Sequence, residues 1–160
     1  MRGVILFLAG VLVGIFAMQP SSAQTDKILS LSHVGISVEN FDEQFNFYTK
    51  TMGFREAFTL RGQDGKPTIS YLQINNDTFV ELLAANANRP PGLHHLGLEV
   101  ENVQATTTRL RQQDVKVEAP RVGGPTKALL TNATGPSGIT IELLEFGPDS
   151  LQRKAIDSYR

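Results

Sequence analysis

Two histidines and two glutamates recur at matched positions in two similar stretches of the chain. His33 opens the segment HVGISV and is followed 48 positions later by Glu81, whereas His95 opens HLGLEV and is followed 47 positions later by Glu142. Imidazole and carboxylate groups are ligands that suit Zn, Ni, Co, Mn or Fe(II), with water in the open coordination positions. The repeat therefore predicts one divalent metal ion bound by His33, Glu81, His95 and Glu142.

Each of these residues, taken alone, has an ordinary structural explanation, such as a hydrogen-bonded core histidine or a solvent-facing edge glutamate. A carboxylate inside an apolar strand is costly to bury unless it is paired or bound to a cation, and here the pattern occurs twice. His94 has the wrong strand parity to be a ligand. Glu99 shares the face of His95, but its counterpart in the first copy is Ser37. We therefore expect Glu99 to be a solvent-facing rim residue rather than a catalytic base.

The residues around these four predict the same order of elements twice: a strand, a helix and three strands. Asn40 and Asn102 are the expected helix N-caps, and they lie 62 positions apart, as the two histidines do. Alternation places the apolar side chains of each first strand toward the helices and the histidines on the opposite face. The expected strands of the first module (31–87) are 31–38, 55–61, 68–74 and 78–84, and those of the second (93–147) are 93–100, 115–118, 127–131 and 138–146. The expected class is α+β, built from two βαβββ modules.

The N-terminus has the pattern of a signal peptide over residues 1–23. Arg2 precedes an apolar run over residues 3–18, and Ser21-Ser22-Ala23 supplies small residues before a cut at Gln24. This pattern predicts export to the periplasm or beyond the cell, without stable membrane association after cleavage; an uncleaved anchor is the alternative. Residues 24–30 are read as an extension and 148–160 as a tail with a short surface helix to which we assign no function.

The bulk composition narrows the class of protein. The chain has 160 residues, a formal net charge of −1 and no cysteine. Its length suits one domain, expected over residues 31–147. Disulfides, thiolate nucleophiles and zinc–thiolate sites are excluded, and the charge offers no basic surface for nucleic acid.

Residues 31–146 resemble the vicinal oxygen chelate superfamily, which includes glyoxalase, methylmalonyl-CoA epimerase, extradiol dioxygenases and fosfomycin or bleomycin resistance proteins. The resemblance rests on the opening segment 33–38, on Asn46-Phe47-Tyr48 with the helix end Met52-Gly53-Phe54, and on the closing segment 138–143. It implies a cup-shaped mixed sheet with the ion in the cup, a small-molecule substrate and a homodimer.

The two-histidine, two-glutamate set is similar to that of glyoxalase I, in which a metal-bound glutamate leaves the ion and moves a proton. The resemblance thus implies an exported metal-dependent lyase or isomerase that acts on a small α-oxygenated carbonyl compound, with Glu142 or Glu81 as the base and Glu142 preferred. Three alternatives stay open. They are an epimerase, which normally has Gln in place of Glu81; a binding protein that sequesters a small molecule in an apolar cup lined by Phe47, Phe58 and Phe79; and an extradiol-type dioxygenase that uses Fe(II) and oxygen.

Overall fold

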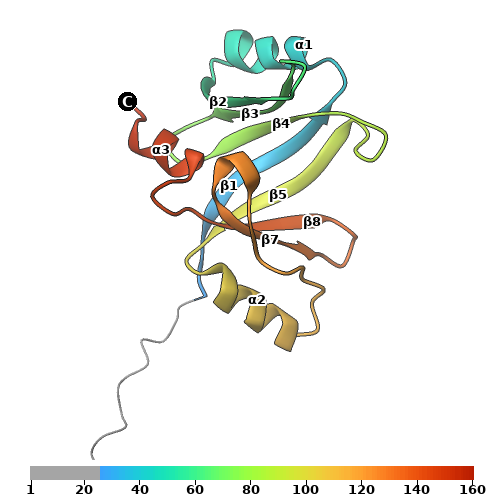
Figure 1. Cartoon of the computed structure of the whole chain (residues 1–160), viewed down its shortest axis with the longest axis vertical. Helices are drawn as coiled ribbons and strands as arrows, with labels where there is room; N and C mark the ends of the chain where they lie inside the picture. The colour runs from blue at the N-terminus through green and yellow to red at the C-terminus, as the bar shows by residue number, and fades with distance from the viewer. Residues whose placement is uncertain (1–25) are drawn as a thin grey trace, which may run out of the picture.

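The computed structural model describes residues 26–160 as one curled sheet of eight strands with helices on both faces (Figure 1). The expected signal peptide, residues 1–23, lies outside the described residues. Within residues 26–160, no helix has the length and apolar character needed to cross a membrane. In chain order the elements are β1 (Ile28–Val38), α1 (Phe41–Asn46), the π-helical turn η1 (Phe47–Thr51), β2 (Arg55–Arg61), β3 (Pro67–Gln73), β4 (Phe79–Ala84), β5 (Gly92–Val100), α2 (Val103–Gln112), β6 (Arg121–Val122), the 3₁₀ turn η2 (Gly124–Thr126), β7 (Leu129–Thr134), β8 (Thr140–Glu145) and α3 (Leu151–Asp157).

The strand order β2-β3-β4-β1-β5-β8-β7-β6 is symmetrical about its centre. In each module the first strand runs parallel to the last one, β1 beside β4 and β5 beside β8. The modules join through the antiparallel pair of β1 and β5, so they pair within a single chain. The predicted fold class, two βαβββ modules in a mixed sheet, is therefore confirmed.

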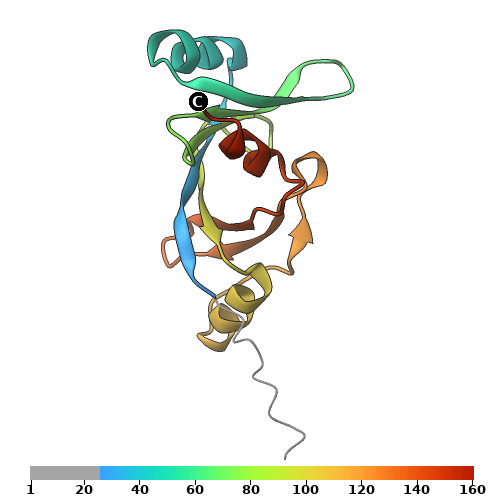
Figure 2. The ribbon, with the colours of Figure 1, turned by 90° about the vertical axis from the view of Figure 1, so that its left-hand side faces the viewer.

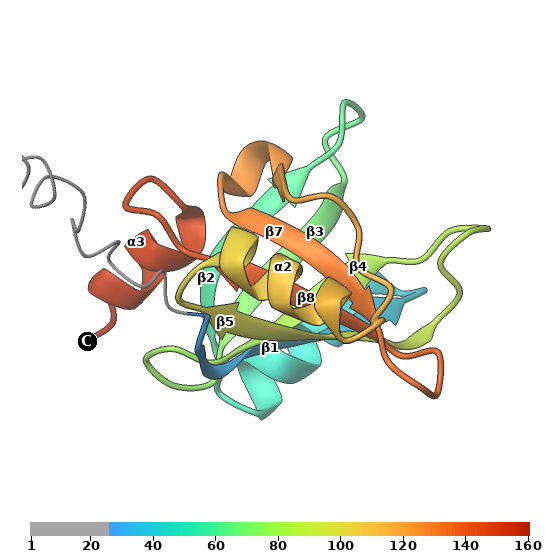
Figure 3. The same cartoon turned by 90° about the horizontal axis from the view of Figure 1, so that it is seen from below.

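The helices α1 and α2 cover the convex outer face of the sheet, one for each module (Figures 1 and 3). Each begins where the sequence predicts, because Asn40 accepts a hydrogen bond from the Glu43 amide at 3.3 Å and Asn102 accepts one from the Ala105 amide at 2.7 Å. Beneath α1 lie the buried apolar residues Val38, Leu72, Val80 and Leu82. Beneath α2 lie Val100, Ala133 and Leu143, which pack with Val103 of the helix itself. Because side chains alternate along a strand, the residues between these buried ones lie on the opposite, concave face of the sheet.

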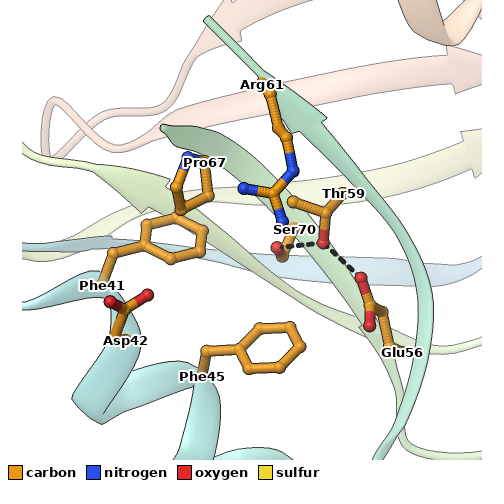
Figure 4. Close-up of a pocket in the computed structure, with 8 residues that line it drawn as sticks. All are labelled: Phe41, Asp42, Phe45, Glu56, Thr59, Arg61, Pro67 and Ser70. Atoms are coloured by element: carbon orange, nitrogen blue, oxygen red, sulfur yellow. Dashed lines mark hydrogen bonds between the residues drawn. The ribbon is translucent and has the colours of Figure 1, made fainter. Parts of the chain in front are cut away.

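A shallow hollow of about 200 Å³ lies on the outer face between α1 and the β2–β3 hairpin (Figure 4). Three of its polar side chains are hydrogen bonded to one another. The Thr59 hydroxyl donates to Glu56 at 2.6 Å and lies 2.7 Å from the Ser70 hydroxyl. Ser70 alternates with Tyr71 along β3, so this hollow lies on the face opposite to the histidines.

One predicted strand is wrong. Residues 115–118 form no strand: Val117 makes an isolated bridge to Ala133, and the short strand of this region is β6, further along the chain. Two features explain the difference. The Arg111 side chain donates to the carbonyl oxygens of Val117 and Glu118 at 3.1 and 2.8 Å, and Pro120 brings no amide donor to a strand at this point.

The C-terminal helix α3 lies on the concave side of the curled sheet (Figure 2). Ala155 is only 6 % exposed and packs with Tyr71 and Phe79 of the first module, while Ile156 also packs against Leu130 of the second. The sequence correctly predicts a short helix in the tail, but the expectation that it lies on the surface is wrong. Its buried side faces the interior of the cup.

Candidate metal centre

The register of the four central strands places the predicted ligands in two neighbouring rows on the concave face. Each row runs across three adjacent strands in the order glutamate, glycine, histidine. The rows are Glu81–Gly35–His95 on β4, β1 and β5, and Glu142–Gly97–His33 on β8, β5 and β1. Because β1 and β5 are antiparallel, the rows run in opposite directions, and the two histidines meet at the centre of the sheet.

All four predicted side chains converge. The Nε2 atoms of His33 and His95 are 2.8 Å apart. The Oε2 atom of Glu81 lies 3.0 Å from Nε2 of His95 and 3.6 Å from that of His33. The Oε2 atom of Glu142 lies 3.4 Å from Nε2 of His33 and 3.8 Å from that of His95. Ligand atoms held about 2.1 Å from one ion are separated by about 3 to 3.5 Å in tetrahedral or cis octahedral geometry. The donor atoms of His33, Glu81 and His95 all lie within 4.8 Å of one another and suit a shared cation, whereas Glu142 contacts both imidazoles but lies outside this group of three.

The chemistry of this cluster also fits a cation. His33, Glu81 and His95 are all buried, and their donor atoms lie within 4.8 Å of one another. The Glu81 Oε2 atom is buried without a hydrogen-bond partner of suitable geometry. Burial of an unpaired carboxylate oxygen is costly, and a metal ion removes that cost. The residues present therefore fit a divalent metal ion.

The neighbouring carboxylates shift the titration of His95 toward its protonated form. Burial lowers the pKa of His95, but the contact with the Glu81 carboxylate and the negative charges of Glu81 and Glu142 outweigh it, so the pKa lies above its usual value. Burial raises the pKa of Glu142, but the side-chain hydrogen bond with His33 and the electrostatic effect of His33, His95 and Arg121 outweigh it, so this pKa lies below its usual value. A divalent ion and a proton would compete for the Nε2 atom of His95, because both bind the same lone pair.

A cavity of about 290 Å³ opens beside the cluster on the concave face. Glu81 and Glu142 reach it from the floor, while Tyr71 comes from β3 and Gln152 from α3. Burial raises the pKa of the Tyr71 phenol well above its usual value, and the charges of the two glutamates add to this effect. Tyr71 therefore stays protonated and can donate a hydrogen bond beside the carboxylates.

The family model of the Glyoxalase/Bleomycin resistance protein/Dioxygenase superfamily matches residues 30–143. The chain belongs to this superfamily. It is similar to the Uncharacterized protein YaeR of Escherichia coli strain K12, with 26 % identity over 71 % of this chain and 93 % of that protein. Among solved structures, a methylmalonyl-CoA epimerase from Mycobacterium tuberculosis superposes with a TM-score of 0.66 and 26 % identity, over 78 % of this chain and 92 % of the other. A variant of the Streptomyces coelicolor epimerase, in complex with 2-nitronate-propionyl-CoA, gives a TM-score of 0.65 and 23 % identity over 78 % and 99 %.

Two glycines of this glyoxalase-superfamily chain make room for the histidines. A Cβ atom at Gly97 would lie 2.1 Å from the His33 ring, and one at Gly35 would lie 2.3 Å from the His95 ring. Each imidazole thus lies directly over the glycine of the other module. The glycines are part of the motif that repeats in both copies, yet their role depends on the partner strand, which the sequence of one strand does not show.

We predict that Gly97→Ala keeps the fold but weakens metal binding by about 10- to 100-fold, the range typical of residues that orient a ligand. The new methyl group would overlap the buried His33 ring, so the ring must move from its position in the cluster. Isothermal titration with Zn²⁺ and a thermal unfolding curve check both parts. Gly147→Ala is the matched control, because a Cβ atom there meets nothing within 4 Å. Equal Zn²⁺ affinity in the two variants would contradict this role of the glycine.

The residue before each histidine contacts the other ring nitrogen. Ser32 Oγ lies 3.2 Å from Nδ1 of His33, and His94 Nδ1 lies 2.8 Å from Nδ1 of His95. These contacts orient the rings so that both Nε2 atoms face the centre. His94 thus contacts a predicted ligand on the side of the ring that faces away from the centre of the cluster.

Two sequence-based expectations about the cup are wrong. Glu99 is not a solvent-facing rim residue: it is 9 % exposed, and its Oε1 atom accepts a hydrogen bond from Arg153 of α3 at 2.9 Å. Phe47 does not line the cup either, because it lies in η1 on the outer side and is 46 % exposed. Phe58 and Phe79 pack around Tyr71 rather than against the cavity. The cavity wall is therefore more polar than the sequence suggests.

Proposed function

We propose that this protein is a metal-dependent enzyme that moves a proton on the carbon next to a carbonyl group of a small oxygenated substrate. Glyoxalase-type lyase or isomerase chemistry is the form we favour. The observation that carries the proposal is the convergence of two imidazoles and two carboxylates, of which the carboxylates line a cavity. His33, Glu81, His95 and Glu142 would hold the ion, which is Zn, Ni, Co, Mn or Fe(II) by the nature of its donors.

The two carboxylates differ in their exposure, and we assign their roles from this difference. The Glu142 side chain is 16 % exposed, whereas that of Glu81 is 7 % exposed. The ion, when bound, supplies a Lewis acid that polarises the substrate carbonyl and makes the neighbouring carbon acidic. Glu142, the more accessible carboxylate, takes up the proton, while Glu81 keeps the imidazoles in place. The protonated Tyr71 hydroxyl lies on the same cavity wall and can donate to a developing negative charge.

An epimerase is the second candidate, favoured by the likeness in fold to methylmalonyl-CoA epimerases. Epimerisation needs the same removal of a proton beside a carbonyl, followed by its return to the other face. This chain differs from the epimerase pattern at Glu81, where the resemblance to the epimerase implies Gln. A second carboxylate favours the glyoxalase-type reading of the site.

The remaining alternatives receive less support from the cavity. A sequestering protein would be expected to have an apolar cup, whereas the lining of this one is mixed. Glu81, Glu142, Arg121 and Gln152 line it together with apolar residues such as Leu60, Ile69, Leu130 and Leu144. A ring-cleaving dioxygenase needs open positions for both catechol and oxygen on a two-histidine, one-carboxylate face, and the fourth protein ligand proposed above would occupy that space.

Solvent isotope exchange tests the proposal without knowledge of the true substrate. The Zn²⁺- or Ni²⁺-loaded protein is incubated in D₂O with the methylglyoxal–glutathione hemithioacetal and, separately, with methylmalonyl-CoA, and products are followed by NMR. We expect deuterium at the carbon beside the carbonyl, and no exchange above background after chelation of the metal. Turnover of the hemithioacetal supports the glyoxalase reading and turnover of the thioester the epimerase reading. Catechol-dependent oxygen uptake without exchange would instead support the dioxygenase.

Export and dimer formation complete the proposal. The signal-peptide pattern of residues 1–23 supports a mature protein that begins at Gln24 in the periplasm or outside the cell. N-terminal sequencing of the protein from those fractions tests this, and recovery of the intact N-terminus would contradict it. We also expect a homodimer, which light scattering of the purified protein measures.

A further inference from the structure

The helix α3 lies outside residues 30–143, the region that the superfamily model matches, yet it occupies the concave side of the cup (Figure 2). It is a seven-residue helix capped by Ser150, which accepts a hydrogen bond from the Arg153 amide at 3.2 Å. The family match therefore accounts for the floor of the cup but not for this wall.

Contacts from both modules fix α3 in place. From the first module, Arg55 donates to the Ser158 carbonyl at 3.0 Å, and Gln73 donates to the Ala155 carbonyl at 3.3 Å. From the second module, Glu99 pairs with Arg153 at 2.9 Å. The apolar side of the helix is buried in the two inner clusters. These contacts hold α3 against both modules, so the helix forms one fixed wall of the cup.

One polar side chain of this wall lines the cavity of the metal centre. Gln152 is 1 % exposed, lines the cavity together with Glu81 and Glu142, and interacts with the Tyr71 side chain. Its Oε1 atom has no hydrogen-bond partner. A buried amide oxygen without a partner is costly, so a hydrogen-bond donor in the cavity would be favoured beside it.

The size of the cavity restricts the group that carries this donor. About 290 Å³ is at the lower limit of the range found for small-molecule sites. We propose that α3 limits the part of a substrate next to the metal centre to a compact oxygenated group, and that Gln152 is a specificity-determining residue whose Oε1 accepts a hydrogen bond from a substrate hydroxyl or amide N–H. This inference rests on the proposed function, because it takes the cluster around His33 as the reacting centre.

Binding of hydroxamic acids to the Co²⁺-loaded protein tests the inference. Acetohydroxamic acid is a compact chelator with vicinal oxygens and an N–H donor, and octanohydroxamic acid is its extended analogue; the visible spectrum of Co²⁺ reports both. We expect the wild-type protein to prefer the compact probe. Gln152→Met, which keeps the bulk but loses the acceptor, should bind it about 10-fold more weakly, the effect of one hydrogen bond. Gln152→Ala should lower the affinity for the compact probe. It should also reduce the difference in affinity between the two probes, because it enlarges the cavity.

Lys154→Ala is the matched control, since Lys154 lies on the exposed side of the same helix, and it should bind both probes as the wild type does. Thermal unfolding and Co²⁺ content are measured for every variant. Unchanged affinity for the compact probe in folded, Co²⁺-loaded Gln152→Met, or equal wild-type affinity for both probes, would overturn this inference and leave the proposed function standing. If neither probe binds the Co²⁺-loaded wild-type protein, both fail, because the ion then has no open position for substrate oxygens.

Discussion

Replacement of His33 by alanine is expected to abolish tight binding of divalent metal. His33 is fully buried, and its Nε2 atom lies within 3.6 Å of donor atoms from all three other predicted ligands. Removal of a direct ligand should cost more than the roughly 100-fold upper limit for residues that only orient ligands. Isothermal titration with Zn²⁺, Ni²⁺ and Co²⁺ gives the affinities.

The same loss should be visible in stability. At a metal concentration about 100 times the dissociation constant, binding raises the free energy of unfolding by about 2.7 kcal/mol. The wild-type protein should show this increase and His33→Ala should not. His95→Ala is the equivalent variant from the other module, and His94→Ala is the graded control, with an expected loss of only about 10- to 100-fold. If His94→Ala bound metal more weakly than His33→Ala, the assignment of ligands would be contradicted.

Replacement of Glu142 by glutamine is expected to lower turnover by about 10²- to 10⁴-fold, the usual contribution of a positioned general base. The amide cannot take up a proton, yet it has nearly the shape of the carboxylate, so the fold should be unchanged. The amide is also a weaker ligand, so rates are compared at saturating metal, in the isotope-exchange assay. Glu39→Gln, at an exposed position before α1, is the control and should retain full turnover.

Glu81→Gln separates the two carboxylates. If Glu142 is the base, the Glu81 variant should lose metal affinity more than it loses turnover at saturating metal. If the two variants show the reverse pattern, Glu81 is the base and Glu142 is the residue that mainly supports metal binding. Full turnover in both variants would exclude proton transfer by either glutamate.

The duplication made the candidate site predictable from the sequence. A matched pair of histidines and glutamates in two modules fixes the parity of each residue on its strand, and parity decides the face of the sheet. Once β1 and β5 pair, the repeat necessarily brings His33 and His95 together. The sequence could not show that each histidine lies over Gly97 or Gly35, because a cross-strand neighbour depends on the register between the modules. The repeated His-x-Gly pattern was the available signal.

The inner wall of the cup was not predictable from local pattern. Gln152 and Arg153 look like surface residues of a short polar helix, and Glu99 looks like the outer edge of a strand. Their partners are distant in sequence: Arg153 pairs with Glu99 across 54 positions, and Gln73 reaches the Ala155 carbonyl across 82. Burial of such polar groups follows from tertiary pairing, which local periodicity does not encode.

The central claim is that His33, Glu81, His95 and Glu142 bind one common ion, and anomalous diffraction tests it most directly. Crystals are grown from mature protein purified without added metal, and data are collected at the absorption edges of Mn, Fe, Co, Ni and Zn. The account predicts one anomalous peak per chain, within about 2.3 Å of the two Nε2 atoms and of a carboxylate oxygen. No peak at this position, with the four side chains hydrogen bonded only to one another or to water even after a soak in these metals, would contradict it.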